Sequence, residues 1–322
     1  MKKFAALLLT FVLFISLCPV SGLAEGTGKI QVVTTIFPIY DWVREVAGDT
    51  GNTEITLLLD SGVDLHSFQP SAQDILKVAT CDLFIYVGGE SDEWAEDALA
   101  EAVNPDMVVI SLVEALGENA KAEEIVEGMQ AEEEEEEGEE GEEEEIDEHV
   151  WLSLRNAQVF TSAIADALAQ KDPANADSYR ANAEAYGAKL AALDAAYAEA
   201  VDSAAHKTLL FGDRFPFRYL TDDYGLAYYA AFAGCSAETE ASFETVIFLA
   251  KKTDELQLPA VLTIEGKDHR IAETIIGSTA DKNRKLLTLN SMQGTTANDI
   301  EQGATYLKIM EDNLAVLKEA LN

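Results

Sequence analysis

Two histidines stand out, because each lies where a chain commonly offers a ligand. His66 belongs to the loop Asp-Leu-His-Ser-Phe-Gln-Pro at 64–70, which follows an apolar, strand-like run over Ile55–Asp60. His149 belongs to the segment Asp-Glu-His-Val-Trp at 147–151, which opens a predicted helix. One such histidine alone is more often a satisfied surface or core residue. Two of them, each at a strand-to-helix or loop-to-helix junction, favour imidazole ligands for a borderline metal ion.

An acidic run at 131–148 leads directly into His149. Fourteen of its eighteen residues are Glu or Asp. A block of like charge repels itself and cannot be buried, so we expect a solvated loop. Such runs usually serve only solubility. Beside a candidate histidine ligand, however, carboxylates would concentrate divalent cations, and the position therefore favours metal capture.

Length and charge narrow the class of protein. The chain has 322 residues, of which 48% are hydrophobic, and this is enough for two lobes of ordinary domain size. The net charge is −37, of which the acidic run supplies −14. The remainder is still acidic, which argues against nucleic acid as a partner, because phosphate binding needs a basic face.

The N-terminus has the pattern of a secretory signal. Two lysines at 2–3 precede an apolar stretch at 4–17 and the small-residue segment Gly-Leu-Ala at 22–24. We therefore expect a signal peptide at 1–24 and an extracytoplasmic protein, in the periplasm or at the cell surface. Lipid attachment at Cys18 is the alternative, although its neighbours Leu17 and Pro19 fit a lipoprotein signal poorly. Cys81 and Cys235 could pair in an oxidising compartment, but Cys81 precedes an apolar strand and is predicted to be a buried free thiol.

Apolar runs alternate with helix-like stretches on both sides of one long helical segment. This alternation predicts α/β lobes, each with a central, mostly parallel sheet flanked by helices. We expect an N-terminal lobe at 28–170, a connecting helix at 173–204 and a C-terminal lobe at 205–322. The predicted strands are Ile30–Thr35, Ile55–Asp60, Leu83–Val87, Met107–Leu112, Thr208–Gly212, Ala227–Ala231, Ala260–Ile264 and Lys285–Leu289, and a last helix is predicted over Ala297–Leu321. Ligands of open parallel sheets bind at the carboxyl ends of the strands, so both lobes should face one cleft.

Several segments resemble one family, the metal-binding solute receptors (cluster A-I) of bacterial ABC importers for zinc and manganese. The opening VVTTIFPIYDWVREVAGD is similar to the family's first strand and helix, and LLLDSGVDLHSFQPSAQDILKVATCDLFIYVGGESDEW resembles its most specific motif. DEHVWLSLRNA resembles its Asp-Pro-His-x-Trp-Leu-Asp-Pro segment, with departures at Glu148, Ser153 and Leu154. AETEASFETVIFLAKKTDELQLPAVLTIEG and YLKIMEDNLAVLKEALN are similar to its C-terminal elements. The resemblance covers nearly the whole chain after the signal.

The resemblance implies His66 and His149 as ligands from the N-terminal lobe. In the C-terminal lobe the family's ligand position falls on Arg214, which cannot coordinate a cation because it stays protonated. Asp213 is the expected oxygen ligand there, with an ion pair to Arg214 or Arg218 as its alternative role. Glu265 faces the expected cleft and is included in the predicted set, although in the family this residue is more often a supporting one. Asn290 is the closest equivalent of the family's fourth ligand, but its neutral amide is a weak ligand for zinc.

The expected function is therefore that of a monomeric receptor, not an enzyme. It would capture a divalent transition metal between the lobes and deliver it to the membrane permease of an ABC importer. Zinc is favoured because two imidazoles and a carboxylate suit it, and manganese is the alternative because added oxygen ligands suit manganese. A secreted metal-dependent hydrolase with Glu265 as its base and a calcium-buffering protein are the competing classes.

Overall fold

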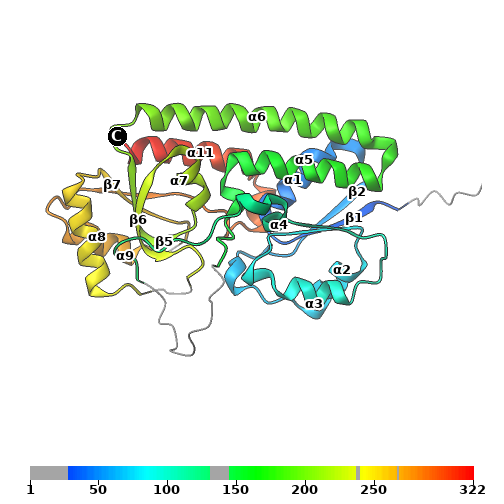
Figure 1. Ribbon diagram of the computed structural model, residues 1–322, viewed down its shortest axis with the longest axis horizontal. Coiled ribbons are helices and arrows are strands. Elements are labelled where there is room, and N and C mark those ends of the chain that lie inside the picture. The colour runs from blue at the N-terminus through cyan, green and yellow to red at the C-terminus, as the bar shows by residue number, and fades with distance from the viewer. Residues whose placement is uncertain (1–27, 131–144, 237–239, 267) are drawn as a thin grey trace, which may run out of the picture.

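The structure is a computed structural model that describes residues 28–130, 145–236, 240–266 and 268–322. The predicted signal peptide at 1–24 and most of the acidic run, 131–144, lie outside the described residues. Two parallel four-stranded sheets lie side by side beneath one long helix (Figure 1). This arrangement confirms the predicted fold class. No helix in the described ranges has the length and apolar character needed to cross a membrane.

The N-terminal lobe is built on the first sheet, with strand order β2-β1-β3-β4. This order places the ends of β1 and β3 at the middle of the sheet, and all three pairings are parallel. The loops that follow these strands therefore open on one edge. The strands are β1 (Ile30–Thr34), β2 (Thr53–Leu57), β3 (Leu83–Tyr86) and β4 (Val108–Ser111), and the helices are α1 (Phe37–Ala47), α2 (Ala72–Thr80), α3 (Trp94–Ala100), α4 (Leu112–Leu116) and α5 (Leu154–Lys171).

The C-terminal lobe repeats the plan with strand order β6-β5-β7-β8. Its strands are β5 (Thr208–Phe215), β6 (Ala227–Ala233), β7 (Ala260–Thr263) and β8 (Lys285–Thr288), and its helices are α7 (Arg218–Tyr224), α8 (Phe243–Glu255), α9 (Arg270–Ser278), α10 (Ala297–Glu301) and α11 (Tyr306–Ala320). β5 extends beyond the predicted end at Gly212, with a register irregularity between Phe211 and Arg214. Asp213 therefore lies within the strand, and the prediction that it directly follows the strand is wrong.

The long helix α6 covers Ala176–Ser203 and follows a short 3₁₀ turn at Pro173–Asn175. At about 1.5 Å per residue its 28 residues extend roughly 42 Å. The helix packs against α1 and α5 of the N-terminal lobe and against α7 and α11 of the C-terminal lobe. Its buried side chains recur at helical spacing: Tyr179, Tyr186, Leu190, Leu193 and Tyr197. This apolar face is what holds one helix against both lobes.

The last predicted helix is interrupted, so the expectation of one helix over 297–321 is wrong. Gly303 takes a left-handed φ of +95°, which ends the first segment. Thr305 then caps α11 by accepting a hydrogen bond from the backbone N–H of Lys308. The sequence signal for the break was this Gly followed by a Thr cap inside an otherwise helical pattern.

A shared core ties the two lobes together below α6. The rings of Trp42 in α1 and Tyr306 in α11 are 5.1 Å apart, and the Tyr306 hydroxyl donates to the carbonyl of Trp151. Asp41 accepts from the backbone N–H of Tyr306 at 2.8 Å, and Trp151 Nε1 donates to the carbonyl of Ser291. The segment that carries His149 is therefore anchored to both lobes by buried contacts.

Candidate metal centre

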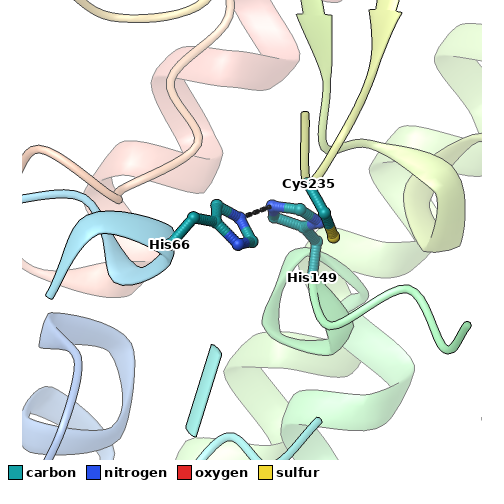
Figure 2. A group of neighbouring side chains, drawn as sticks. All are labelled: His66, His149 and Cys235. Atoms are coloured by element: carbon teal, nitrogen blue, oxygen red, sulfur yellow. Dashed lines mark hydrogen bonds between the residues drawn. The ribbon is translucent and has the colours of Figure 1, made fainter. Parts of the chain in front are cut away.

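His66 is presented by a short 3₁₀ turn, Leu65–Ser67, in the loop after β2. The Asp64 carboxylate caps this turn and accepts from the backbone N–H of His66 at 3.1 Å. Leu65 is buried in the core and anchors the turn from below. The His66 side chain is 9% exposed and points toward His149 (Figure 2).

His149 is completely buried at the start of the 3₁₀ turn Val150–Leu152. The Asp147 carboxylate lies 2.9 Å from its backbone N and 3.0 Å from its Nδ1. A buried carboxylate that holds Nδ1 fixes the orientation of the ring and leaves the lone pair of Nε2 for a metal.

The two imidazoles meet through Nε2, at 3.2 Å. Two nitrogens bound to one tetrahedral zinc at about 2.0–2.1 Å would lie about 3.3 Å apart, so the rings are already near the spacing that zinc requires. The two histidines that the sequence singled out, 83 residues apart in the chain, are thus brought together.

Cys235 is the third member of this cluster (Figure 2). Its sulfur, one ring nitrogen of His66 and one ring nitrogen of His149 all lie within 4.8 Å of one another. Cys235 lies in the loop after β6, and its backbone N–H donates to Glu123 Oε1 at 3.1 Å. A Cβ on the preceding Gly234 would lie 3.0 Å from the His149 ring, so a residue without a side chain allows the close approach.

Burial sets the protonation of the cluster before metal binds. Desolvation and the adjacent His149 lower the pKa of His66 to about 3, so its ring is neutral at physiological pH. Burial, with Asp147 and Glu123 nearby, raises the pKa of the Cys235 thiol well above its usual range. A metal that binds here must therefore displace the thiol proton, and a bound divalent cation does so readily.

Asp213 and Glu265 lie outside this cluster. Asp213 lines the same cavity as His66, of about 640 Å³, but its Oδ2 accepts from the Thr263 hydroxyl at 2.5 Å. Glu265 accepts from the backbone N–H and hydroxyl of Ser291 at 2.6 and 2.8 Å, and it thereby holds the loop after β8. Both carboxylates already have hydrogen-bond donors, and their predicted role as ligands stays a prediction.

Arg214 joins the two lobes beside the cluster. Its guanidinium lies 2.5 Å from Asp64 Oδ2 and contacts the carbonyl of Ser236 at 3.4 Å. Arg214, at the position where the family usually has a metal ligand, therefore stabilises the His66 turn through Asp64. Its side-chain partner is Asp64 rather than Asp213.

Cys235 was not predicted as a site residue. The structure shows both Cys81 and Cys235 as free thiols, and Cys81 is buried, as predicted. A signal for Cys235 was nevertheless present, because the residue stands just after a predicted parallel strand, Ala227–Ala231. The rule that places ligands at the carboxyl ends of strands applied to it as it did to His66.

Known proteins share the sequence over most of the chain. The family described as zinc-uptake complex component A, periplasmic (ZnuA), matches residues 32–320. The chain is 32% identical over 320 residues to the zinc-binding lipoprotein AdcA of Streptococcus pneumoniae, covering 99% of this chain and 61% of AdcA. It is 31% identical over 302 residues to the high-affinity zinc uptake system protein ZnuA of Bacillus subtilis, covering 93% of this chain and 90% of that protein. The chain thus spans about three fifths of the length of AdcA.

Solved structures share the fold. The Zn(II)-bound ZnuA-like domain of Streptococcus pneumoniae AdcA superposes with a TM-score of 0.70 at 28% identity, covering 91% of this chain and 99% of that domain. The metal-dependent lipoprotein YcdH of Bacillus subtilis superposes with a TM-score of 0.73 at 26% identity, covering 91% of this chain and 99% of YcdH. The sequence match and the two-lobe fold together show that this chain belongs to the ZnuA family of zinc-uptake components.

Proposed function

We propose that this chain is an extracytoplasmic receptor that binds zinc through His66, His149 and Cys235 and delivers it to the permease of an ABC importer. The observation that carries the proposal is the cluster itself, in which two imidazole nitrogens and a thiol converge from both lobes. The family description as a periplasmic zinc-uptake component supports the extracytoplasmic location and the transport role.

The ligand types favour zinc over manganese. Zinc forms strong bonds with thiolate and imidazole, whereas manganese prefers carboxylate and water oxygens. In a tetrahedral zinc site, sulfur at about 2.3 Å and nitrogen at about 2.05 Å would lie about 3.6 Å apart. All ligand atoms here lie within 4.8 Å of one another, so each sulfur–nitrogen separation exceeds that spacing by at most about 1.2 Å.

A hydrolase built on the same ligands is not supported. Glu265 is the predicted base for that alternative. Its carboxylate oxygens already accept hydrogen bonds from Ser291 and from the backbone N–H of Gly294. The family is one of zinc-uptake components, which are transport receptors rather than enzymes.

The test is zinc titration of the wild-type chain, His66→Ala and His206→Ala by competition with a chelating dye. We expect one tight zinc per chain in the wild type. Loss of a metal ligand should weaken zinc binding by more than the ~100-fold that marks the upper end for supporting residues. His206 is a matched control, since it is a partly exposed imidazole outside the cluster. An unchanged zinc affinity in His66→Ala would overturn the site.

A further inference from the structure

A buried carboxylate, Glu148, lies behind the His66 ring on the side away from His149. Its side chain is 2% exposed. Its Oε1 accepts from the backbone N–H of Ser91, at 2.8 Å, in the turn after β3. A Cβ on Gly89 would lie 2.5 Å from Oε1, so this turn packs directly on the carboxylate. Glu148 is one of the residues at which this chain departs from the family's pattern.

Ser91 connects Glu148 with His66. The Ser91 hydroxyl lies 2.7 Å from His66 Nδ1. Glu148 Oε2 lies 3.6 Å from the same nitrogen and has no hydrogen-bond partner among the described residues. Burial raises the pKa of Glu148, and its interactions with the Ser91 side chain and backbone oppose that rise. The nitrogen of His66 that faces away from the cluster therefore lies against a hydroxyl and a carboxylate.

We propose that Glu148, together with Ser91, is a positioning residue for His66 in zinc binding. A neutral imidazole has one N–H, and a hydroxyl and carboxylate at Nδ1 keep the proton there. The lone pair of Nε2 then points at the metal. Asp147 does the same for His149, so two consecutive carboxylates orient the two histidines. This inference rests on the proposed zinc site.

Glu148 also affects the electrostatics of the cluster when zinc is bound. Zinc with one thiolate and two neutral imidazoles carries a net charge of +1. The carboxylates of Asp147 and Glu148 are both 2% exposed and lie next to the ligands, where they offset this charge with little screening from water. Loss of Glu148 should therefore weaken zinc binding even though it does not touch the metal.

The test compares Glu148→Ala, Glu148→Gln and Glu90→Gln by competition titration with zinc. We expect Glu148→Ala to bind zinc about 10–100-fold more weakly. Glu148→Gln should fall between Ala and wild type, because it keeps an acceptor for Ser91 but loses the charge. Glu90 is exposed in the same turn, so Glu90→Gln controls for charge alone and should keep wild-type affinity.

The visible spectrum of bound cobalt(II) separates positioning from a general loss of stability. A displaced imidazole changes the ligand-field bands of cobalt, whereas a less stable but intact site keeps them. Wild-type affinity in Glu148→Ala, or weaker binding with an unaltered cobalt spectrum, would overturn the role of Glu148. If His66→Ala also bound zinc normally, the proposed zinc site itself would fail, which is a distinguishable result.

Discussion

Zinc binding by this chain should release one proton, and the proton should come from Cys235. Before zinc binds, burial keeps the pKa of this thiol above its usual range and keeps the pKa of His66 at about 3. Above neutral pH the thiol is therefore still protonated while the His66 ring is already neutral. Zinc needs the thiolate, so it must displace one proton there.

The release of one proton sets how strongly the zinc affinity depends on pH. One proton released per zinc makes the affinity rise tenfold per pH unit, or about 1.4 kcal/mol. The rise should hold between about pH 7.5 and 8.5, where imidazoles and carboxyls with ordinary pKa values no longer titrate. The direction is stronger binding as the pH rises, because fewer protons then compete for the sulfur. The lowered pKa of His66 places its own titration far below this range.

Isothermal calorimetry in buffers of different ionisation enthalpy counts the protons directly. We expect one proton per zinc for the wild type and none for Cys235→Ser, whose hydroxyl keeps its proton at these pH values. Release of no proton by the wild type would refute the assignment of Cys235 as a ligand. Equal release by Cys235→Ser would refute it as well.

Three further predictions concern the other carboxylates, the acidic run and the packing around Gly212. Asp213→Ala and Glu265→Ala should each weaken zinc binding less than loss of a histidine ligand does, and titration that shows a comparable loss would place that carboxylate on the metal. Deletion of residues 132–145 should leave one tight zinc and remove weak additional equivalents, because a run of like charges offers only weak sites; calorimetry that loses the tight site would contradict this. Gly212→Ala should destabilise the fold by about 1–3 kcal/mol in urea unfolding, because its Cβ would lie 2.4 Å from the Cα of Ala272, and an unchanged midpoint would contradict this packing.

The sequence predicted much of the fold because its signals are local. Continuous apolar runs set the strands, and helical spacing of aromatic residues along 179–197 set the long helix. The break at Gly303 also had a local signal, the Gly followed by the Thr305 cap. The extension of β5 beyond Gly212 depends on pairing with a neighbouring strand, which forms only in the folded chain.

The candidate site was predictable only in part. His66 and His149 were predicted from their residue type and their position in the chain, and the structure places their Nε2 atoms 3.2 Å apart. Cys235 lies 86 residues after His149, and its approach depends on the packing of the C-terminal lobe against the N-terminal lobe. Asp213 looked like a loop residue, but it lies inside a strand and bonds to Thr263. Contacts between lobes have no local signature in one sequence.

The most direct test of the account is X-ray absorption at the zinc edge of the zinc-loaded wild-type chain. The proposed ligands predict one sulfur at about 2.3 Å together with nitrogen from two imidazoles at about 2.0–2.1 Å. Cys235→Ser should lose the sulfur shell and keep the imidazole signal. A wild-type spectrum with only nitrogen and oxygen neighbours would contradict the central claim that His66, His149 and Cys235 bind the metal together.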